Sequence, residues 1–272
     1  MTLHPLAARF GAVADAYERG RPDYTPAVVG AIAAELGLAP GARVLDLAAG
    51  TGKLTRALIA GGFDAVAVEP QAQLREHLAA AVGAERALDG VAEAIPLADG
   101  EVAAVTVADA FHWFDAPRAL MEIERVLAPG GGLAVLVTLP DWRGASWGDA
   151  LGRMIAEARP EHPQFDGTPW QESVRARSAW TEPREIGITI PQSASLQRTL
   201  DYLSSISWVA ALDEGERAAM LSRAATLIEE GEMPLETRLH VNIGLSRLSQ
   251  CHRRGDGDIA SPGRGGDSPE RG

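Results

Sequence analysis

Between residues 25 and 139 the apolar side chains alternate between the period of a strand and the period of a helix. Short runs that are apolar on both faces predict buried strands, and apolar residues three and four apart predict helices. The predicted strands are 43–48, 64–70, 86–90, 102–110 and 132–139, and the predicted helices are 26–36, 53–62, 71–82 and 116–128. Strands separated by helix-length segments indicate a parallel sheet with right-handed crossovers, so the predicted fold class is α/β.

Beyond Leu139 this alternation gives way to a segment rich in tryptophan, proline and charged residues. Four of the six tryptophans lie between residues 140 and 183. Residues 184–191 and 238–248 then alternate like strands, and the segment from 195 to 208 has helical spacing. The chain therefore returns to regular structure after an irregular insertion.

Two features mark the end of the ordered chain. Asp213 and Glu216 form a capping-box pattern, which predicts the start of another helix that ends at Gly231. From residue 251 to 272 the composition falls to glycine, proline, serine and charged residues. We predict that this tail is disordered and has no buried role.

Composition and charge narrow the class of protein. The chain has 25 basic and 37 acidic residues and a net charge of −12, which argues against a nucleic acid or an anionic membrane as partner. The single cysteine, Cys251, leaves neither an intramolecular disulfide nor a cysteine cluster for a metal. No apolar run approaches the roughly 20 residues that span a bilayer. These observations predict a soluble, cytoplasmic protein.

The turn after the first strand is the first candidate for chemistry. In the stretch "VLDLAAGTGKLT", residues 44–55, Gly50 and Gly52 follow the strand directly, where ligands lie in open α/β sheets. Glu69 ends the second strand, 19 residues after Gly50, and an acid at this place is the usual partner of ribose hydroxyls. The alternative is that Gly50 and Gly52 only shape a turn and that Glu69 only precedes a helix. The pairing of turn and acid favours a nucleoside site.

Two residues bear on which nucleoside cofactor the turn would hold. The dinucleotide fingerprint needs a small residue where this chain has Thr55. Asp46, close to the turn, would repel a pyrophosphate and would favour the ammonium and sulfonium charges of S-adenosylmethionine. S-adenosylmethionine is therefore the favoured cofactor, and a nicotinamide dinucleotide is the second.

These residues resemble the class I S-adenosylmethionine-dependent methyltransferases, most closely the small-molecule branch that includes trans-aconitate and ubiquinone/menaquinone-type methyltransferases. Residues 44–55 resemble the first motif of that family, and Glu69 in "VAVEP" resembles its ribose-binding acid. Residues 90–115 and 122–136 are similar to the motifs that follow, and the resemblance spans roughly residues 10 to 248. It implies a Rossmann-like, mostly parallel seven-stranded sheet with helices on both faces and a helical cap.

The resemblance also implies how the chain is divided. One methyltransferase domain would cover residues 1–250, with cap and substrate elements within 1–25, 140–183 and 195–231, and residues 251–272 would lie outside it.

The resemblance assigns roles to particular residues. Asp46 would lie near the methionine amino group, Glu69 would hold the ribose hydroxyls, and Ala92 and Glu93 would pack beside the adenine. Arg21 could pair with the cofactor carboxylate, although an exposed arginine before a proline is the alternative. The other implied cofactor contacts are Tyr17, Ala48, Gly50, Gly52, Asp109, Ala110 and Phe111.

The acceptor side is assigned from aromatic residues. His112, in "FHWF", is the candidate general base, because a neutral imidazole can accept a proton near pH 7. The alternative, that His112 and Trp113 only wall the pocket, remains open. Trp113, Trp142 and Trp208 would shape a pocket for a small organic acceptor, which apolar and aromatic side chains usually line. We expect oxygen to be the methylated atom.

Three functions are thus compared. The first is a small-molecule methyltransferase that uses S-adenosylmethionine. The second is an NAD(P)-dependent oxidoreductase, and the third is a non-catalytic module that senses a cofactor. The glycine turn, Glu69 and the "FHWF" segment favour the first.

Overall fold

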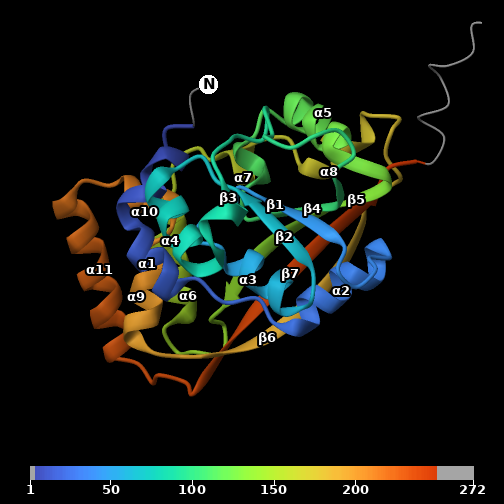
Figure 1. The fold of residues 1–272 in the computed structure, drawn as a ribbon. Coiled ribbons are helices and arrows are strands. Elements are labelled where there is room, and N and C mark those ends of the chain that lie inside the picture. Colours follow the sequence, from blue (N-terminus) through green and yellow to red (C-terminus); the bar gives the residue numbers. More distant parts are fainter. Residues whose placement is uncertain (1–3, 250–272) are drawn as a thin grey trace, which may run out of the picture.

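A seven-stranded sheet forms the centre of the computed structural model, which describes residues 4–249 (Figure 1). The strand order is β3-β2-β1-β4-β5-β7-β6. Strands β1 to β5 pair in parallel, and β7 is antiparallel to both β5 and β6. The strands are β1 Arg43–Leu47, β2 Asp64–Val68, β3 Ala87–Leu88, β4 Val102–Ala108, β5 Leu127–Asp141, β6 Arg184–Ser193 and β7 Glu236–Arg247.

Helices lie on both faces of this sheet and at one end of it. The α-helices are α1 Ala14–Gly20, α2 Pro26–Leu36, α3 Lys53–Ala60, α4 Ala72–Val82, α5 Ala116–Val126, α6 Gly148–Glu157, α7 Pro163–Asp166, α8 Trp170–Arg175, α9 Leu196–Ser204, α10 Ser207–Ala211 and α11 Glu214–Glu229. Three short 3₁₀ segments are η1 Ala7–Val13, η2 Ala84–Arg86 and η3 Phe111–Trp113. Among the residues from 4 to 249, no helix is long and apolar enough to cross a membrane.

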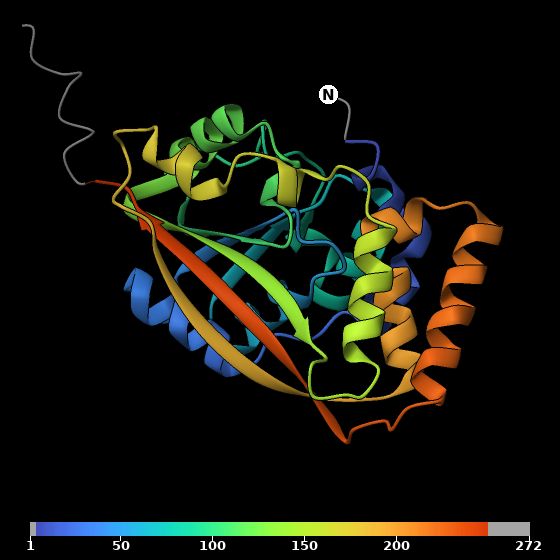
Figure 2. The ribbon, with the colours of Figure 1, turned by 180° about the vertical axis from the view of Figure 1, so that it is seen from behind.

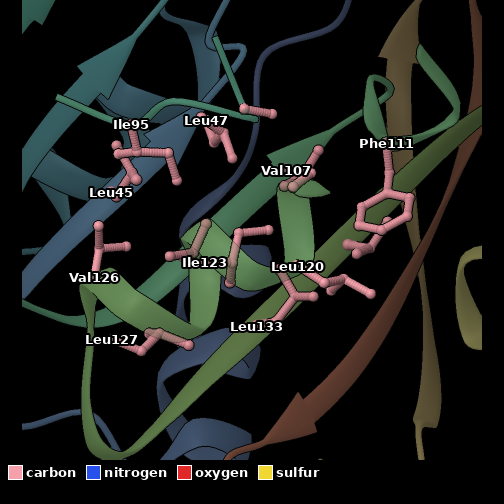
Figure 3. Packing of buried hydrophobic residues seen from close by; sticks show 14 of the residues in the cluster. Leu45, Leu47, Ile95, Val107, Phe111, Leu120, Ile123, Val126, Leu127 and Leu133 are labelled. Atoms are coloured by element: carbon pink, nitrogen blue, oxygen red, sulfur yellow. The ribbon is translucent and has the colours of Figure 1, made fainter. Parts of the chain in front are cut away.

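The alternation of side chains along the strands divides the core into two layers. Val44 packs on the face covered by α2, with Ile32, whereas Leu45 packs on the opposite face in the cluster that includes Ile123 of α5. Figure 3 shows that second layer between the strands and α5. Because successive strand residues point to opposite faces, strands that are apolar at every position are buried on both sides. The α/β prediction is confirmed.

A third apolar cluster joins the cap helices α6, α9, α10 and α11. These helices gather with α1 at one end of the molecule, beyond the strands (Figures 1 and 2). The segment from 140 to 183 is divided, because Trp147 packs in the cap cluster while Trp180 and α8 pack in the sheet core. Only part of this segment therefore packs in the cap, and the rest packs against the sheet.

Two predicted helices differ from the structure. The helix expected over 116–128 ends at Val126, and Leu127 begins β5 beside Val102. Pro129 lies two residues later, and the residue before a proline disfavours helix. The helix expected over 195–208 is interrupted at Ser205, whose carbonyl accepts a hydrogen bond from Arg21 Nη2 at 3.2 Å.

The remaining predicted helices agree with the structure to within two residues at each end, since α3 ends at Ala60 and α11 ends at Glu229. The capping box at Asp213 and Glu216 is present and starts α11. The predicted disordered tail, residues 251–272, lies outside the described residues. The division into a domain over 1–250 with its cap elements remains a prediction.

Candidate active site

A cavity of about 280 Å³ lies where β1, β2, β4 and β5 reach their carboxyl ends. Ala48 follows β1, Glu69 follows β2, Asp109 follows β4, and Thr138 lies near the end of β5, and all four line the cavity. The N-terminal segment and the cap close the cavity from the other side. The site therefore occupies the sheet edge at which parallel strands present their loops.

The two glycines of the turn have different roles. Both have left-handed backbone, with φ +59° at Gly50 and +86° at Gly52, which favours glycine. Gly50 lines the cavity, and a Cβ there would lie 3.7 Å from the Tyr17 ring. A Cβ on Gly52 would lie 2.6 Å from Leu78 Cδ1 of α4. Gly52 therefore allows helix packing, and it is not among the cavity-lining residues.

Glu69 is a buried acid, 3% exposed, on the cavity wall. Its carboxylate accepts hydrogen bonds from the amide of Gly50 at 2.8 Å and from the amide of Gln71 at 2.9 Å. Burial raises the pKa of Glu69 to about 7. No ion pair to Glu69 occurs within residues 4–249, so the carboxylate is free to accept further hydrogen bonds from a ligand.

Asp46 is buried behind the loop, in a smaller pocket that adjoins the cavity. Its carboxylate accepts hydrogen bonds from the hydroxyls of Thr55 at 2.6 Å and of Thr106 at 3.3 Å. Burial raises the pKa of Asp46 to about 6. Thr55 stands where the dinucleotide fingerprint needs a small residue. In this structure its hydroxyl binds the buried carboxylate of Asp46.

Asp109 and Arg21 meet across the mouth of this smaller pocket. Asp109 has a left-handed backbone, φ +51°, and its carboxylate accepts hydrogen bonds from the amide and hydroxyl of Thr138. Arg21 Nη1 lies 3.9 Å from Asp109 Oδ2, and Arg21 Nε donates to Ser205 Oγ at 2.9 Å. A strained non-glycine residue at the end of a strand is typical of a functional site.

The other residues expected beside the cofactor are divided between the cavity and the core. Ala92, Glu93 and Ala110 line the cavity, and Glu93 Oε1 accepts a hydrogen bond from the amide of Asp115 at 2.8 Å. Phe111 points into the core near Leu120 (Figure 3), with its ring centroid 5.5 Å from that of Phe114. The side chain of Phe111 is therefore away from the cavity.

The predicted acceptor residues come together in the cavity. His112, Trp113, Trp142 and Trp208 all line it. Burial, with His162 nearby, lowers the pKa of His112 to about 3, so its imidazole is neutral at pH 7. Tyr17 also lines the cavity, and burial raises its pKa to about 12.

Several lining residues were not predicted. Thr138 lies near the carboxyl end of β5, and the rule for open sheets could have found it. Gln71, two residues after Glu69, could have been found in the same way. His162, Tyr202 and Ser207 lie in segments that were expected to supply cap and substrate elements, but the sequence did not single them out, because only the packing of the cap brings them to the cavity.

Three comparisons relate this chain to known proteins. A family model described as a methyltransferase domain matches residues 45–135. An uncharacterized methyltransferase of Mycobacterium tuberculosis is 37% identical over 225 residues, which are 82% of this chain and 86% of the relative. A malonyl-acyl-carrier-protein O-methyltransferase of Pectobacterium atrosepticum is 29% identical over 213 residues, covering 73% and 79% of the two chains.

A solved structure supports the fold. A protein from Anaeromyxobacter dehalogenans, described as a type II methyltransferase, has a TM-score of 0.59 and 23% identity, and the match covers 84% of this chain and 97% of that chain. The prediction of a Rossmann-like, mostly parallel seven-stranded sheet is confirmed. The family and fold imply S-adenosylmethionine as cofactor. The chain belongs to the class I S-adenosylmethionine-dependent methyltransferases, and it is an enzyme.

Proposed function

We propose that this enzyme transfers the methyl group of S-adenosylmethionine to an oxygen of a small organic acceptor. The observation that carries the proposal is one continuous cavity with two different ends. Glu69 and the Gly50 loop line one end, and aromatic side chains of η3 and the cap line the other. A nucleoside cofactor and an acceptor could therefore meet inside one cavity.

The charges on the cavity wall favour a cationic cofactor. Among the described residues, the lining carboxylates are Glu69, Glu93 and Asp109, and Arg21 is the one lining guanidinium. A pyrophosphate would face this excess of acids, whereas ammonium and sulfonium groups are attracted to it. The side chains of Tyr17 and Trp113 also line the cavity, and aromatic rings attract cations.

The residues of the chain fit this cofactor as follows. Glu69 would accept hydrogen bonds from the ribose hydroxyls, and Asp46 and Asp109 would face the methionine amino group. Arg21, already close to Asp109, would pair with the methionine carboxylate. The remaining wall would come from Tyr17, Ala48, Gly50, Ala92, Glu93 and Ala110. Gly52 and Phe111 would contribute indirectly. Gly52 lets the loop pack against Leu78, and the Phe111 side chain anchors η3 in the core.

When bound, the cofactor supplies a methyl group on a positively charged sulfur, which is transferred by in-line displacement. The chain then has to hold the acceptor oxygen close to that methyl and exclude water, which can supply up to about 7–11 kcal/mol of barrier reduction. Trp113, Trp142 and Trp208 would hold the acceptor. A hydroxyl that gains a methyl must lose its proton, and its acidity rises sharply as the new bond forms. A neutral His112 could take that proton although its pKa is low.

His112 gives a test of this step. Replacing His112 by alanine is expected to lower kcat about 100-fold, because a positioned base contributes at least that factor, while S-adenosylhomocysteine affinity stays within about twofold. Initial rates at saturating cofactor measure the first, and calorimetric titration measures the second. In the unchanged enzyme, titration of His112 should cause no change of kcat at saturating cofactor between pH 5 and 8, because the pKa of His112 is about 3. A fully active variant would leave His112 as a wall.

The proposal as a whole is tested by isothermal titration of the protein with S-adenosylmethionine, S-adenosylhomocysteine and NAD. We expect micromolar binding of both sulfur compounds and none of NAD. Binding of NAD alone would instead support an oxidoreductase. Binding of the sulfur compounds without transfer to any acceptor in a broad screen would favour a sensing module. The cytoplasmic location and the absence of nucleic-acid and membrane partners remain predictions.

A further inference from the structure

His162 and Ser207 form a buried polar pair at the aromatic end of the cavity. The two residues are 1% and 4% exposed, and both line the cavity. His162 Nε2 lies 2.9 Å from Ser207 Oγ. His162 precedes α7 and Ser207 begins α10, so two separate segments of the cap supply the pair.

Which of the two residues donates the hydrogen bond between His162 and Ser207 follows from the contact of the other ring nitrogen, His162 Nδ1. His162 Nδ1 accepts a hydrogen bond from the amide of Gln164 at 3.2 Å. Burial lowers the pKa of His162 to about 4, so the ring is neutral at pH 7. In a neutral imidazole with an accepting Nδ1, the proton is on Nε2. His162 therefore donates to Ser207, and it is not arranged to remove the serine proton.

Ser207 is consequently left with a hydrogen to donate. Its oxygen accepts from His162, and no other hydrogen bond of its hydroxyl occurs within residues 4–249. A buried hydroxyl beside a cavity is stabilised when its hydrogen finds an acceptor. The acceptor would come from the ligand, because Ser207 lines the cavity.

On the cavity side the surroundings of the pair are aromatic, whereas the charged neighbours of His162 do not line the cavity: Asp166 accepts a hydrogen bond from the His162 amide, and Arg159 lies over the Phe165 ring. The ring centroid of His162 lies 4.8 Å from that of Trp113, 5.1 Å from that of Trp208 and 5.4 Å from that of His112. In the described chain, the cap residues from 140 to 208 that line the cavity include no charged side chain. A charged group on the acceptor would therefore be desolvated here without an oppositely charged partner among these lining residues.

We propose that Ser207, oriented by His162, donates a hydrogen bond to an oxygen of the methyl acceptor, so that the pair selects a flat, uncharged acceptor with a hydroxyl or carbonyl group. This inference rests on the proposed function and names its substrate class. Ser207 is the specificity-determining residue, and His162 is a positioning residue that acts through it.

The test compares phenol, toluene and benzoate as probes of the full chain, by ligand-observed NMR titration with and without saturating S-adenosylhomocysteine. Phenol is expected to bind at least fivefold more tightly than toluene, because one net hydrogen bond contributes about this factor to affinity. Benzoate is expected to bind most weakly. Ser207→Ala should abolish the preference for phenol and leave toluene binding within twofold. His162→Leu should reduce the preference, and His162→Gln, which keeps a donor, should restore part of it.

Ser204→Ala is the matched control, because the Ser204 hydroxyl donates to the Leu200 carbonyl within α9 and does not line the cavity. It should leave the preference unchanged. Equal binding of phenol and toluene, a preference that survives Ser207→Ala, tightest binding of benzoate, or no binding of any probe at millimolar concentration would each overturn the inference. Failure of the proposed function would be visible separately, as a failure to bind S-adenosylhomocysteine.

Discussion

Replacing Glu69 by alanine is expected to weaken S-adenosylhomocysteine binding about 1000-fold. The carboxylate would accept two hydrogen bonds from the ribose, and a hydrogen bond to a charged group contributes about 1.5–3 kcal/mol. The same carboxylate holds the amides of Gly50 and Gln71, so its loss also leaves two buried donors unpaired and loosens the loop. Isothermal titration measures the affinity, and unfolding by denaturant checks that the variant is folded.

Two further variants make the Glu69 result specific. Glu69→Gln keeps one accepting oxygen and should fall between the parent protein and Glu69→Ala. Glu76→Ala removes an exposed acid of the neighbouring helix α4 and should bind normally. Equal binding by Glu69→Ala and the parent protein would show that Glu69 does not contact the ligand.

The same interaction predicts a pH dependence. In the free protein the pKa of Glu69 is about 7, so the carboxyl is mostly protonated at pH 5.5 and ionised at pH 8. The ribose hydroxyls favour the ionised form, which lowers the pKa in the complex. Affinity for S-adenosylhomocysteine should therefore rise with pH through 7 and level off above it, by about tenfold between pH 5.5 and 8. An unchanged dependence in Glu69→Gln would assign the titration to another group.

Gly20→Ala is expected to destabilise the protein by about 2–3 kcal/mol. A Cβ at Gly20 would lie 2.3 Å from the amide nitrogen of Tyr202 and 2.4 Å from the carbonyl carbon of Asp201. Both atoms belong to the backbone of α9, which cannot move aside alone, so α1 and α9 must separate. Overpacking of a close contact costs about 1–3 kcal/mol, and the paired hydrogen bonds between Arg19 and Asp201, both 3.0 Å, would also be strained.

The separation should also affect the ligand, because α1 carries Tyr17 and leads into Arg21, which line the cavity. We expect S-adenosylhomocysteine affinity to fall at least tenfold in Gly20→Ala. Gly30→Ala in α2 is the matched control, since a Cβ there meets nothing within 4 Å. It should be neutral or stabilising by up to about 1 kcal/mol, because alanine favours helix over glycine. Equal stability of the two variants would mean that α1 and α9 are not closely packed.

Much of the site could be placed before the fold was known. The period of the apolar residues predicted the order of strands and helices, and parallel strands bring their carboxyl ends to one edge. Gly50, Glu69, Asp109 and His112 each follow or end a strand, so all four could be expected on one wall. Each of these expectations needed only neighbours in sequence and one general rule about sheets.

The neighbours of each residue were not predictable in this way. Gly52 is required by its backbone conformation and by Leu78, and Phe111 turns into the core while Ala110 faces the cavity. The same motif therefore contains residues that line the cavity and residues that support it. The sequence motif does not distinguish the two groups, because they differ only in whether another element of the fold covers the side chain.

The sequence by itself determined the α/β architecture, the cofactor turn and the acid that follows it, because these depend on local periodicity and on strand ends. Only the tertiary structure decided which polar side chains of the cap meet one another and the N-terminal segment. Arg21 meets Ser205, and His162 meets Ser207, across 184 and 45 residues of chain. Such contacts arise when the apolar faces of the cap helices pack together and carry their polar side chains into the cavity, and no local pattern specifies which helices will meet.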